Sequence, residues 1–103
     1  MAGLNQGHPA FIANLVDLEG YAQATLSSAT SAAQTAALIE GVYDVWCDQD
    51  TYIKIGTTAN DVTSGTGYLL RQNNTITALI RQNSKLGAIM STATGTVVYH
   101  KVG

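Results

Sequence analysis

Apolar and polar residues alternate most clearly between Gly41 and Gly56. In the first half, one alternate set is predicted to share a face: Tyr43, Val45 and Cys47. The other set is predicted to point the opposite way: Val42, Asp44, Trp46 and Asp48. In the second half, Ile53 and Ile55 are predicted to lie opposite Tyr52 and Lys54. A two-residue period predicts half-buried strands. Residues 48–50 are turn formers, so we expect the two strands to form a hairpin.

The rest of the chain carries shorter strand patterns separated by turn signals. Further strands are predicted at residues 21–28, 34–40, 68–72, 75–82, 86–92 and 96–102. In the first of these, Ala24 and Leu26 are expected to point inward. In the strand at 86–92, Ala88 and Met90 are expected opposite Ile89. About eight short strands predict an all-β fold, a small antiparallel β-sandwich with the strand count of a jelly roll.

The first twenty residues follow a different pattern. Their apolar residues fit one face of a short helix, although an extended arm lying on a neighbouring chain would use them equally well: Phe11, Ile12, Leu15, Val16 and Leu18. Both forms are left open. We expect residues 1–20 to be an N-terminal arm that binds a partner, and residues 21–103 to be the sandwich domain.

Charged residues make up 12% of the chain, about half the usual share of roughly 25%, and the formal net charge is −2. The five basic residues are scattered, which gives no stripe for nucleic acid. No apolar run reaches the length of a membrane span. Met1 to His8 lacks the pattern of a signal peptide, and one cysteine allows no intrachain disulfide. We therefore expect synthesis in a reducing cytoplasm.

No residue pattern indicates catalysis, a cofactor or a metal site. His8 and His100 have no ligand partners at metal-binding spacing. Asp44, Asp48 and Asp50 form the densest carboxylate cluster. We expect Asp48 and Asp50 to bond the backbone of their own turn. Cys47 is expected to be a buried structural thiol. The sequence therefore predicts a protein that is not an enzyme.

Candidate partner contacts lie outside the arm as well. The polar connection from Thr57 to Gly67 is longer than most, which is typical of a contact loop and points to Asn60 and Asp61. Trp46 is a candidate interface anchor. An alternative interpretation uses Trp46 and Tyr52 together as a platform on which a sugar would stack, as in a carbohydrate-binding module.

Four strand-and-turn motifs follow one another in the second half of the chain: Tyr52-Ile53-Lys54-Ile55-Gly56, Tyr68-Leu69-Leu70, Lys85-Leu86-Gly87-Ala88-Ile89 and Thr94-Gly95-Thr96-Val97-Val98. In this order they resemble small virion proteins of tailed bacteriophages, with Thr94-Gly95 where those proteins commonly carry Gly-Gly. The resemblance implies a jelly-roll-like capsid decoration (cement) protein on the virion surface, without a cofactor. A head–tail connector or tail accessory protein is the alternative that it leaves open.

The resemblance implies that the partner is a major capsid protein. Copies of the chain itself are a second expected partner, because the edge strands of a small open sandwich need cover. A trimer is favoured over a dimer.

Overall fold

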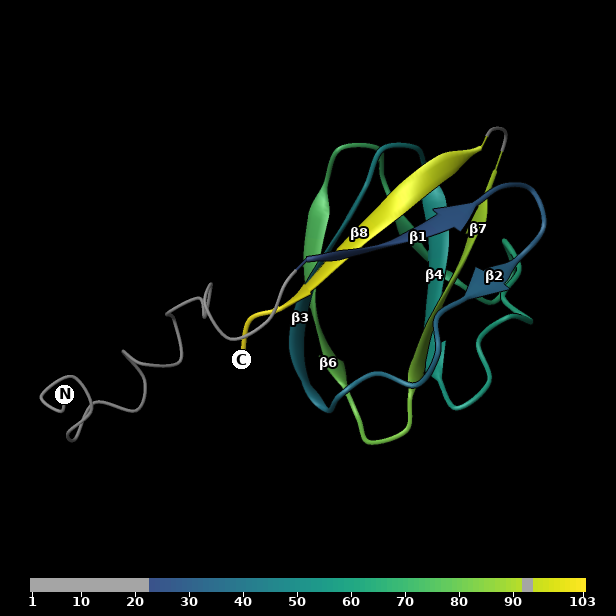
Figure 1. Ribbon diagram of the computed structural model, residues 1–103. Coiled ribbons are helices and arrows are strands. Elements are labelled where there is room, and N and C mark those ends of the chain that lie inside the picture. The colour runs from purple at the N-terminus through teal and green to yellow at the C-terminus, as the bar shows by residue number, and fades with distance from the viewer. Residues whose placement is uncertain (1–22, 92–93) are drawn as a thin grey trace, which may run out of the picture.

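The structure is a computed structural model that describes residues 23–91 and 94–103. Within these ranges the fold is all-β and contains eight strands (Figure 1). They are β1 (Ala24–Ser28), β2 (Ala33–Gln34), β3 (Gly41–Cys47), β4 (Thr51–Gly56), β5 (Tyr68–Leu70), β6 (Thr75–Ile80), β7 (Lys85–Met90) and β8 (Gly95–Lys101). The predicted all-β sandwich is confirmed. The expected arm contacts of Phe11, Ile12, Leu15, Val16 and Leu18 lie outside the described residues.

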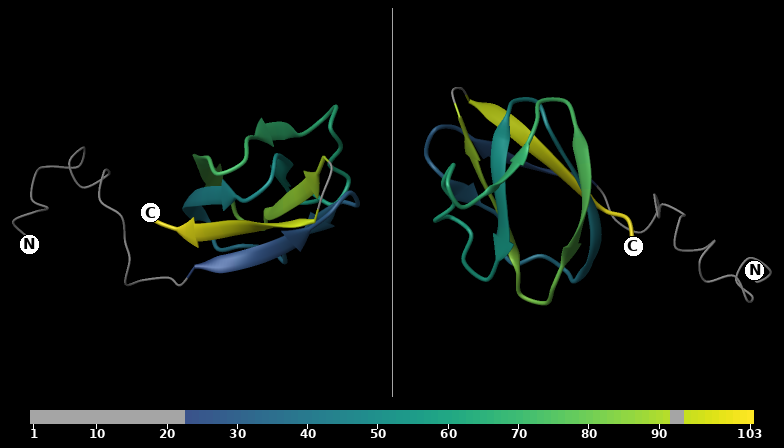
Figure 2. Two further views of the ribbon diagram at one scale, coloured as in Figure 1. Left: turned by 90° about the horizontal axis from the view of Figure 1, so that it is seen from above. Right: turned by 180° about the vertical axis from the view of Figure 1, so that it is seen from behind.

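The strands form two antiparallel sheets of four. Sheet A has the order β1-β8-β3-β6, and sheet B has the order β2-β7-β4-β5. The pairs β1·β8, β2·β7, β3·β6 and β4·β5 are nested, as if one long two-stranded ribbon were wound into a sandwich. Contacts of β3 with β8 and of β4 with β7 complete the sheets. This winding is the jelly-roll arrangement. Figure 2 shows β1 and β8 side by side on one sheet.

The core fills the space between the sheets. Its buried members are Tyr43, Val45, Cys47, Ile53, Leu70, Ile80, Leu86, Ala88, Met90 and Val97. Leu26 packs against this cluster, as expected for an inward residue of β1. On β7, Ala88 and Met90 are buried and Ile89 is only partly covered. The two-residue period therefore assigned these faces correctly.

The predicted hairpin between Gly41 and Gly56 is wrong. Both strands exist, but β3 belongs to sheet A and β4 to sheet B. Residues 48–50 therefore form an arch that carries the chain from one sheet to the other. An alternating pattern shows which side chains face a core, and it is the same for a hairpin and for an arch. Pairing between strands depends on partners elsewhere in the chain, which the pattern does not contain.

The two aspartates of this arch were expected to bond their own turn, but they bond β8 and the turn that follows β5. The Asp48 Oδ1 atom accepts a hydrogen bond from the backbone N–H of Thr96 at 2.8 Å. The Asp50 Oδ1 atom accepts one from the backbone N–H of Gln72 at 2.7 Å. Each carboxylate thereby satisfies a backbone donor at the start of another segment. The aspartates therefore tie the arch to β8 and to the turn at residues 71–74.

Two further arches share one turn sequence. Arg71-Gln72-Asn73-Asn74 leads from sheet B to sheet A, and Arg81-Gln82-Asn83-Ser84 leads back. Each closes with a hydrogen bond from the fourth residue's N–H to the arginine carbonyl, at 3.1 and 3.0 Å. Asn73 and Asn83 have φ values of 62° and 65°. A type II turn needs a positive φ at its third residue, which asparagine tolerates better than most residues do.

The predicted alanine-rich strand at 34–40 is also wrong, because only Ala33–Gln34 forms a strand. The following residues run beside the start of β7 and make single hydrogen bonds to it and to the residue before it, from Thr35 N to the Leu86 carbonyl and from Leu38 N to the Ser84 carbonyl. Alanine has little tendency to form strands, since it lacks the branched side chain that packs on a pleated surface.

Candidate functional site

The long connection between β4 and β5, residues 57–67, packs against the outer face of sheet B. Ala59 and Val62 are 0% and 2% exposed, so the connection has its own apolar anchors. Beneath it, Gly87 of β7 has no room for a side chain, because an added Cβ would collide with the backbone of Ala59. An added Cβ on Gly67 would come within 2.8 Å of Tyr52 and Val62 side-chain atoms. Residues 57–67 are therefore closely packed on sheet B, and we call this connection the cover.

Polar contacts fasten this cover to the sheet. The Oε1 atom of Gln34 on β2 accepts hydrogen bonds from the backbone N–H groups of Ala59 and Asn60, at 3.0 and 3.1 Å. The Lys54 Nζ atom lies 2.6 Å from Asp61 Oδ1. The hydrogen bond from Lys54 lowers the pKa of the Asp61 carboxyl group. Asn60 and Asp61, the predicted contact residues, are exposed, but each is also tied back to sheet B.

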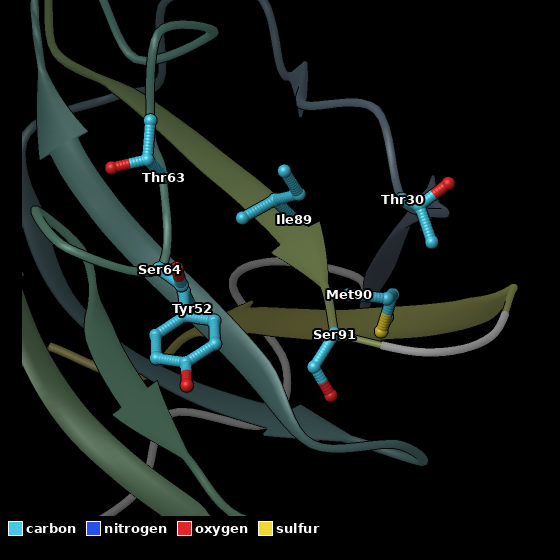
Figure 3. Close-up of a pocket in the computed structure, with 7 residues that line it drawn as sticks. All are labelled: Thr30, Tyr52, Thr63, Ser64, Ile89, Met90 and Ser91. Carbon is cyan, nitrogen blue, oxygen red and sulfur yellow. The ribbon is translucent and has the colours of Figure 1, made fainter.

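A groove of about 470 Å³ opens beside the cover. Its walls come from three connections and from the neighbouring strands β4 and β7 of sheet B: Thr30, Tyr52, Thr63, Ser64, Ile89, Met90 and Ser91. Ile89 lies in the middle, with Thr63 and Ser64 on one side and Thr30 on the other (Figure 3). None of these side chains carries a formal charge. The groove therefore suits a neutral ligand with both apolar and polar surface.

Several hydroxyl groups around the groove have no partner within the described part of the chain. The hydroxyls of Thr30, Tyr52, Ser64 and Ser91 make no hydrogen bond to another described residue. By contrast, the Thr63 hydroxyl is bonded within the cover, where it accepts from the backbone N–H of Gly65 and of Thr66.

Trp46 lies on the other side of the molecule. It is half-buried on the outer face of sheet A, where its register neighbours are Thr75 of β6 and Val98 of β8. Tyr52 faces outward from sheet B, beside Leu69 and Ile89. The two aromatic residues therefore point away from each other. The predicted sugar platform of Trp46 and Tyr52 is wrong, because consecutive strands joined by an arch expose opposite faces.

The side of the sandwich formed by β5 and β6 is open. These are the edge strands of sheets B and A on that side. Four large apolar side chains are exposed among the described residues, and three lie on these strands: Tyr68 at 61%, Leu69 at 38% and Leu79 at 53%. We call Tyr68, Leu69 and Leu79 the open-side residues. Sequence reasoning missed them, although the outward position of Leu79 follows from the alternation of Thr75, Thr77 and Leu79.

The predicted partner residues do not form one surface. Asn60 and Asp61 lie over sheet B, and Trp46 lies over sheet A. The apolar residues Ala59 and Val62, on either side of Asn60 and Asp61, were the available signal that the connection packs inward.

Several titratable groups among the described residues make structural contacts. Cys47 is buried, and burial raises the pKa of its thiol. Its Sγ atom lies 3.4 Å from the Leu70 carbonyl oxygen and 3.3 Å from that of Arg71. Asp44 accepts a hydrogen bond from the Thr77 hydroxyl at 2.8 Å. Within residues 23–91 and 94–103, no group of three metal-ligating side chains comes together, and no helix is long and apolar enough to cross a membrane.

Neither protein-family models, nor curated protein sequences, nor solved structures yield a match to this chain.

Proposed function

We propose that the protein is a structural component of a bacteriophage particle, a capsid decoration protein that bridges major capsid subunits. The observation that carries most weight is the exposure of three large apolar side chains on β5 and β6, the edge strands of the two sheets. Leu69 points outward from sheet B and Leu79 from sheet A, so they offer apolar contacts to two different partner surfaces. The jelly-roll winding agrees with this role, since viral capsid domains use the same architecture. A shared fold alone does not carry a function.

The mechanism follows from burial and repetition. Each contact removes apolar surface from water, which contributes about 25 cal/mol for each Å². A single contact through a few side chains is weak, and a particle presents the same site many times. A chain that touches two capsid subunits gains from the high effective concentration of the second site. Low charge suits this role, because few ionic groups need to lose their water on docking.

The direct experiment counts and locates the copies of this chain in phage particles from cells that produce it. Purified particles are analysed by quantitative mass spectrometry and by cryo-electron microscopy. We expect hundreds of copies on the outer surface of the head. About a dozen copies at the neck or tail would instead support the connector or tail accessory role. Absence of the chain from purified particles would contradict both roles.

A second candidate function, carbohydrate binding, is favoured by the groove beside Tyr52. An aromatic ring next to uncharged hydroxyl groups is suited to a sugar, which has apolar ring faces and polar edges. The test is a glycan array with the Tyr52→Ala and Trp46→Ala variants. Binding that is lost with Tyr52→Ala and kept with Trp46→Ala would place a sugar in this groove. The absence of binding by the unmodified chain would remove this candidate.

A further inference from the structure

The four edge strands of the sandwich differ in how they are protected. A free edge exposes unpaired backbone N–H and C=O groups that can pair with another strand. Sheet B has short edges, since β2 has two residues and β5 has three. Sheet A has long edges, since β1 has five residues and β6 has six. Short edge strands are one of the ways in which proteins prevent pairing, so sheet B is protected and sheet A is not.

β6 lacks the other protective features as well. Its sequence, Thr-Ile-Thr-Ala-Leu-Ile, contains no charged residue and no proline. Its register with β3 is continuous from Thr75 to Ile80, so no bulge bends it away. Within the described part of the chain, β3 is its only strand partner. The outward side chains of Thr75, Thr77 and Leu79 are all exposed. β6 is therefore ready to accept a further strand.

We propose that this further strand is β6 of a second copy, paired antiparallel about a two-fold axis at Thr77. This inference goes beyond the proposed function and concerns the self-association that the sequence predicts. An uncharged strand can face its own copy without bringing like charges together. A two-fold contact also closes on itself, whereas pairing of β6 with a different edge would continue from copy to copy unless a ring formed. The resulting dimer differs from the trimer that the sequence favoured.

The register follows from the positions of the apolar residues. With Thr77 opposite the partner's Thr77, Leu79 lies opposite the partner's Thr75. Trp46 is the register neighbour of Thr75 on β3, so the partner's Trp46 lies next in the same row. On the other side, Leu79 neighbours Val42. The pairing therefore places exposed Leu79 between Val42 of its own copy and the partner's Thr75, with the partner's Trp46 one strand further along the row. In the symmetry-related row, Trp46 and the partner's Leu79 are separated by Thr75 alone, so the indole ring and the leucine side chain lie over one continuous face of the joined sheets.

Cross-linking through Thr77 tests the axis directly. The variant Thr77→Cys is treated with a short bismaleimide, which joins thiols only when they are close. Residues opposite each other on antiparallel strands have Cβ atoms about 5 Å apart. We expect Thr77→Cys to give a covalent dimer in high yield. The control is Thr25→Cys on β1, the other long edge of sheet A, which should stay monomeric. Cys47 is buried and does not compete.

Two cross-linking results would overturn the proposal. One is an equal, low yield for Thr77→Cys and Thr25→Cys. The other is a mixed dimer between Thr77→Cys and Thr25→Cys chains, which would show that β6 pairs with β1 of the next copy.

Sedimentation of uncross-linked variants provides the second measurement. We expect the unmodified chain to dimerise as its concentration rises, and Leu79→Lys to weaken dimerisation at least tenfold while the circular dichroism spectrum stays unchanged. Thr25→Lys adds the same charge at the opposite edge and should dimerise normally. A chain that stays monomeric at its solubility limit, or a Leu79→Lys variant that dimerises as the unmodified chain does, would contradict the proposal. Binding of the same variants to particles is scored separately, so that loss of the dimer is distinguished from loss of the particle role.

Discussion

The two outer faces of the sandwich differ in whether their apolar residues are covered by the chain itself. On sheet B, the connection of residues 57–67 folds back and brings its own Ala59 and Val62 into full burial. On sheet A, no described connection lies over the outward residues, and Leu79 remains 53% exposed. Both faces belong to strands with the same alternating pattern. The difference therefore arises from the connections. The outer face of sheet B is covered by a segment of the same chain, whereas the outer face of sheet A stays exposed and can bind another molecule.

The largest expected effect comes from filling the space beneath the cover. Gly87→Ala places a methyl group where the backbone of Ala59 lies. Overpacking of this kind costs about 1–3 kcal/mol, since the connection must move outward. Urea denaturation measures the loss. The matched control is Gly56→Ala in β4 of the same sheet, where an added Cβ has only an ordinary contact at 3.5 Å. Equal stability of the two variants would mean that the cover is loosely held.

Removing an apolar anchor of the cover gives the next effect. Val62 is 2% exposed, and Val62→Ala should destabilise the fold by about 1–2 kcal/mol through lost burial. Leu79→Ala on the open side removes more atoms, and it should change stability by less than about 0.5 kcal/mol when measured on dilute protein. Thermal melts check whether Val62→Ala, which removes fewer atoms, is nevertheless the less stable variant. The reverse order would show that sheet A, not sheet B, is the face closed within the chain.

Trp46→Ala removes the largest side chain on the outer face of sheet A. A tryptophan in a core would cost about 3–5 kcal/mol on truncation. Trp46 is half-buried outside the core cluster, so we expect about 1 kcal/mol in dilute protein. Denaturation at two protein concentrations separates folding from association. A loss of about 3–5 kcal/mol in the free energy of unfolding at both concentrations would mean that the ring is buried within the single chain.

The smallest effect concerns the ion pair at the rim of the cover. Lys54 lowers the pKa of the Asp61 carboxyl group, whose ordinary value is 3.8. A depressed pKa in the folded state stabilises the fold above the ordinary value, and that contribution is lost as the pH falls through the folded value. Exposed pairs contribute little, so Asp61→Asn should hardly change stability at neutral pH. NMR titration of the Asp61 carboxyl carbon checks the direction. An unshifted or raised pKa would mean that the pair is not formed in solution.

The sequence determined the faces of the strands, whereas their pairing came only from the structure. Tyr43, Val45 and Cys47 are buried as predicted, because a two-residue period directly reports which side chains share a face. The same period does not distinguish an arch from a hairpin, so β3 and β4 were wrongly paired. Asp48 shows the same limit. Its bond to Thr96 joins residues that are far apart in sequence, and no local pattern records such a contact.

The candidate surfaces were predictable only in part. The length of the 57–67 connection indicated a special role, and its two apolar residues are the reason that it packs down. The groove beside Tyr52 depends on Thr30 and Thr63 lying on either side of Ile89, which requires the full winding of the chain. The open side depends on β5 and β6 both being edges. Edge positions are a property of strand order, and strand order follows from long-range pairing.

Amide hydrogen exchange at two protein concentrations tests most directly whether sheet B is closed within the chain and sheet A is completed by a second copy. The Ala59 amide, which is bonded to Gln34, should be protected at both concentrations. The β6 amides that point away from β3 should exchange freely in dilute protein and become protected in concentrated protein. Protection of these β6 amides at high dilution, or unprotected exchange at Ala59, would contradict this account.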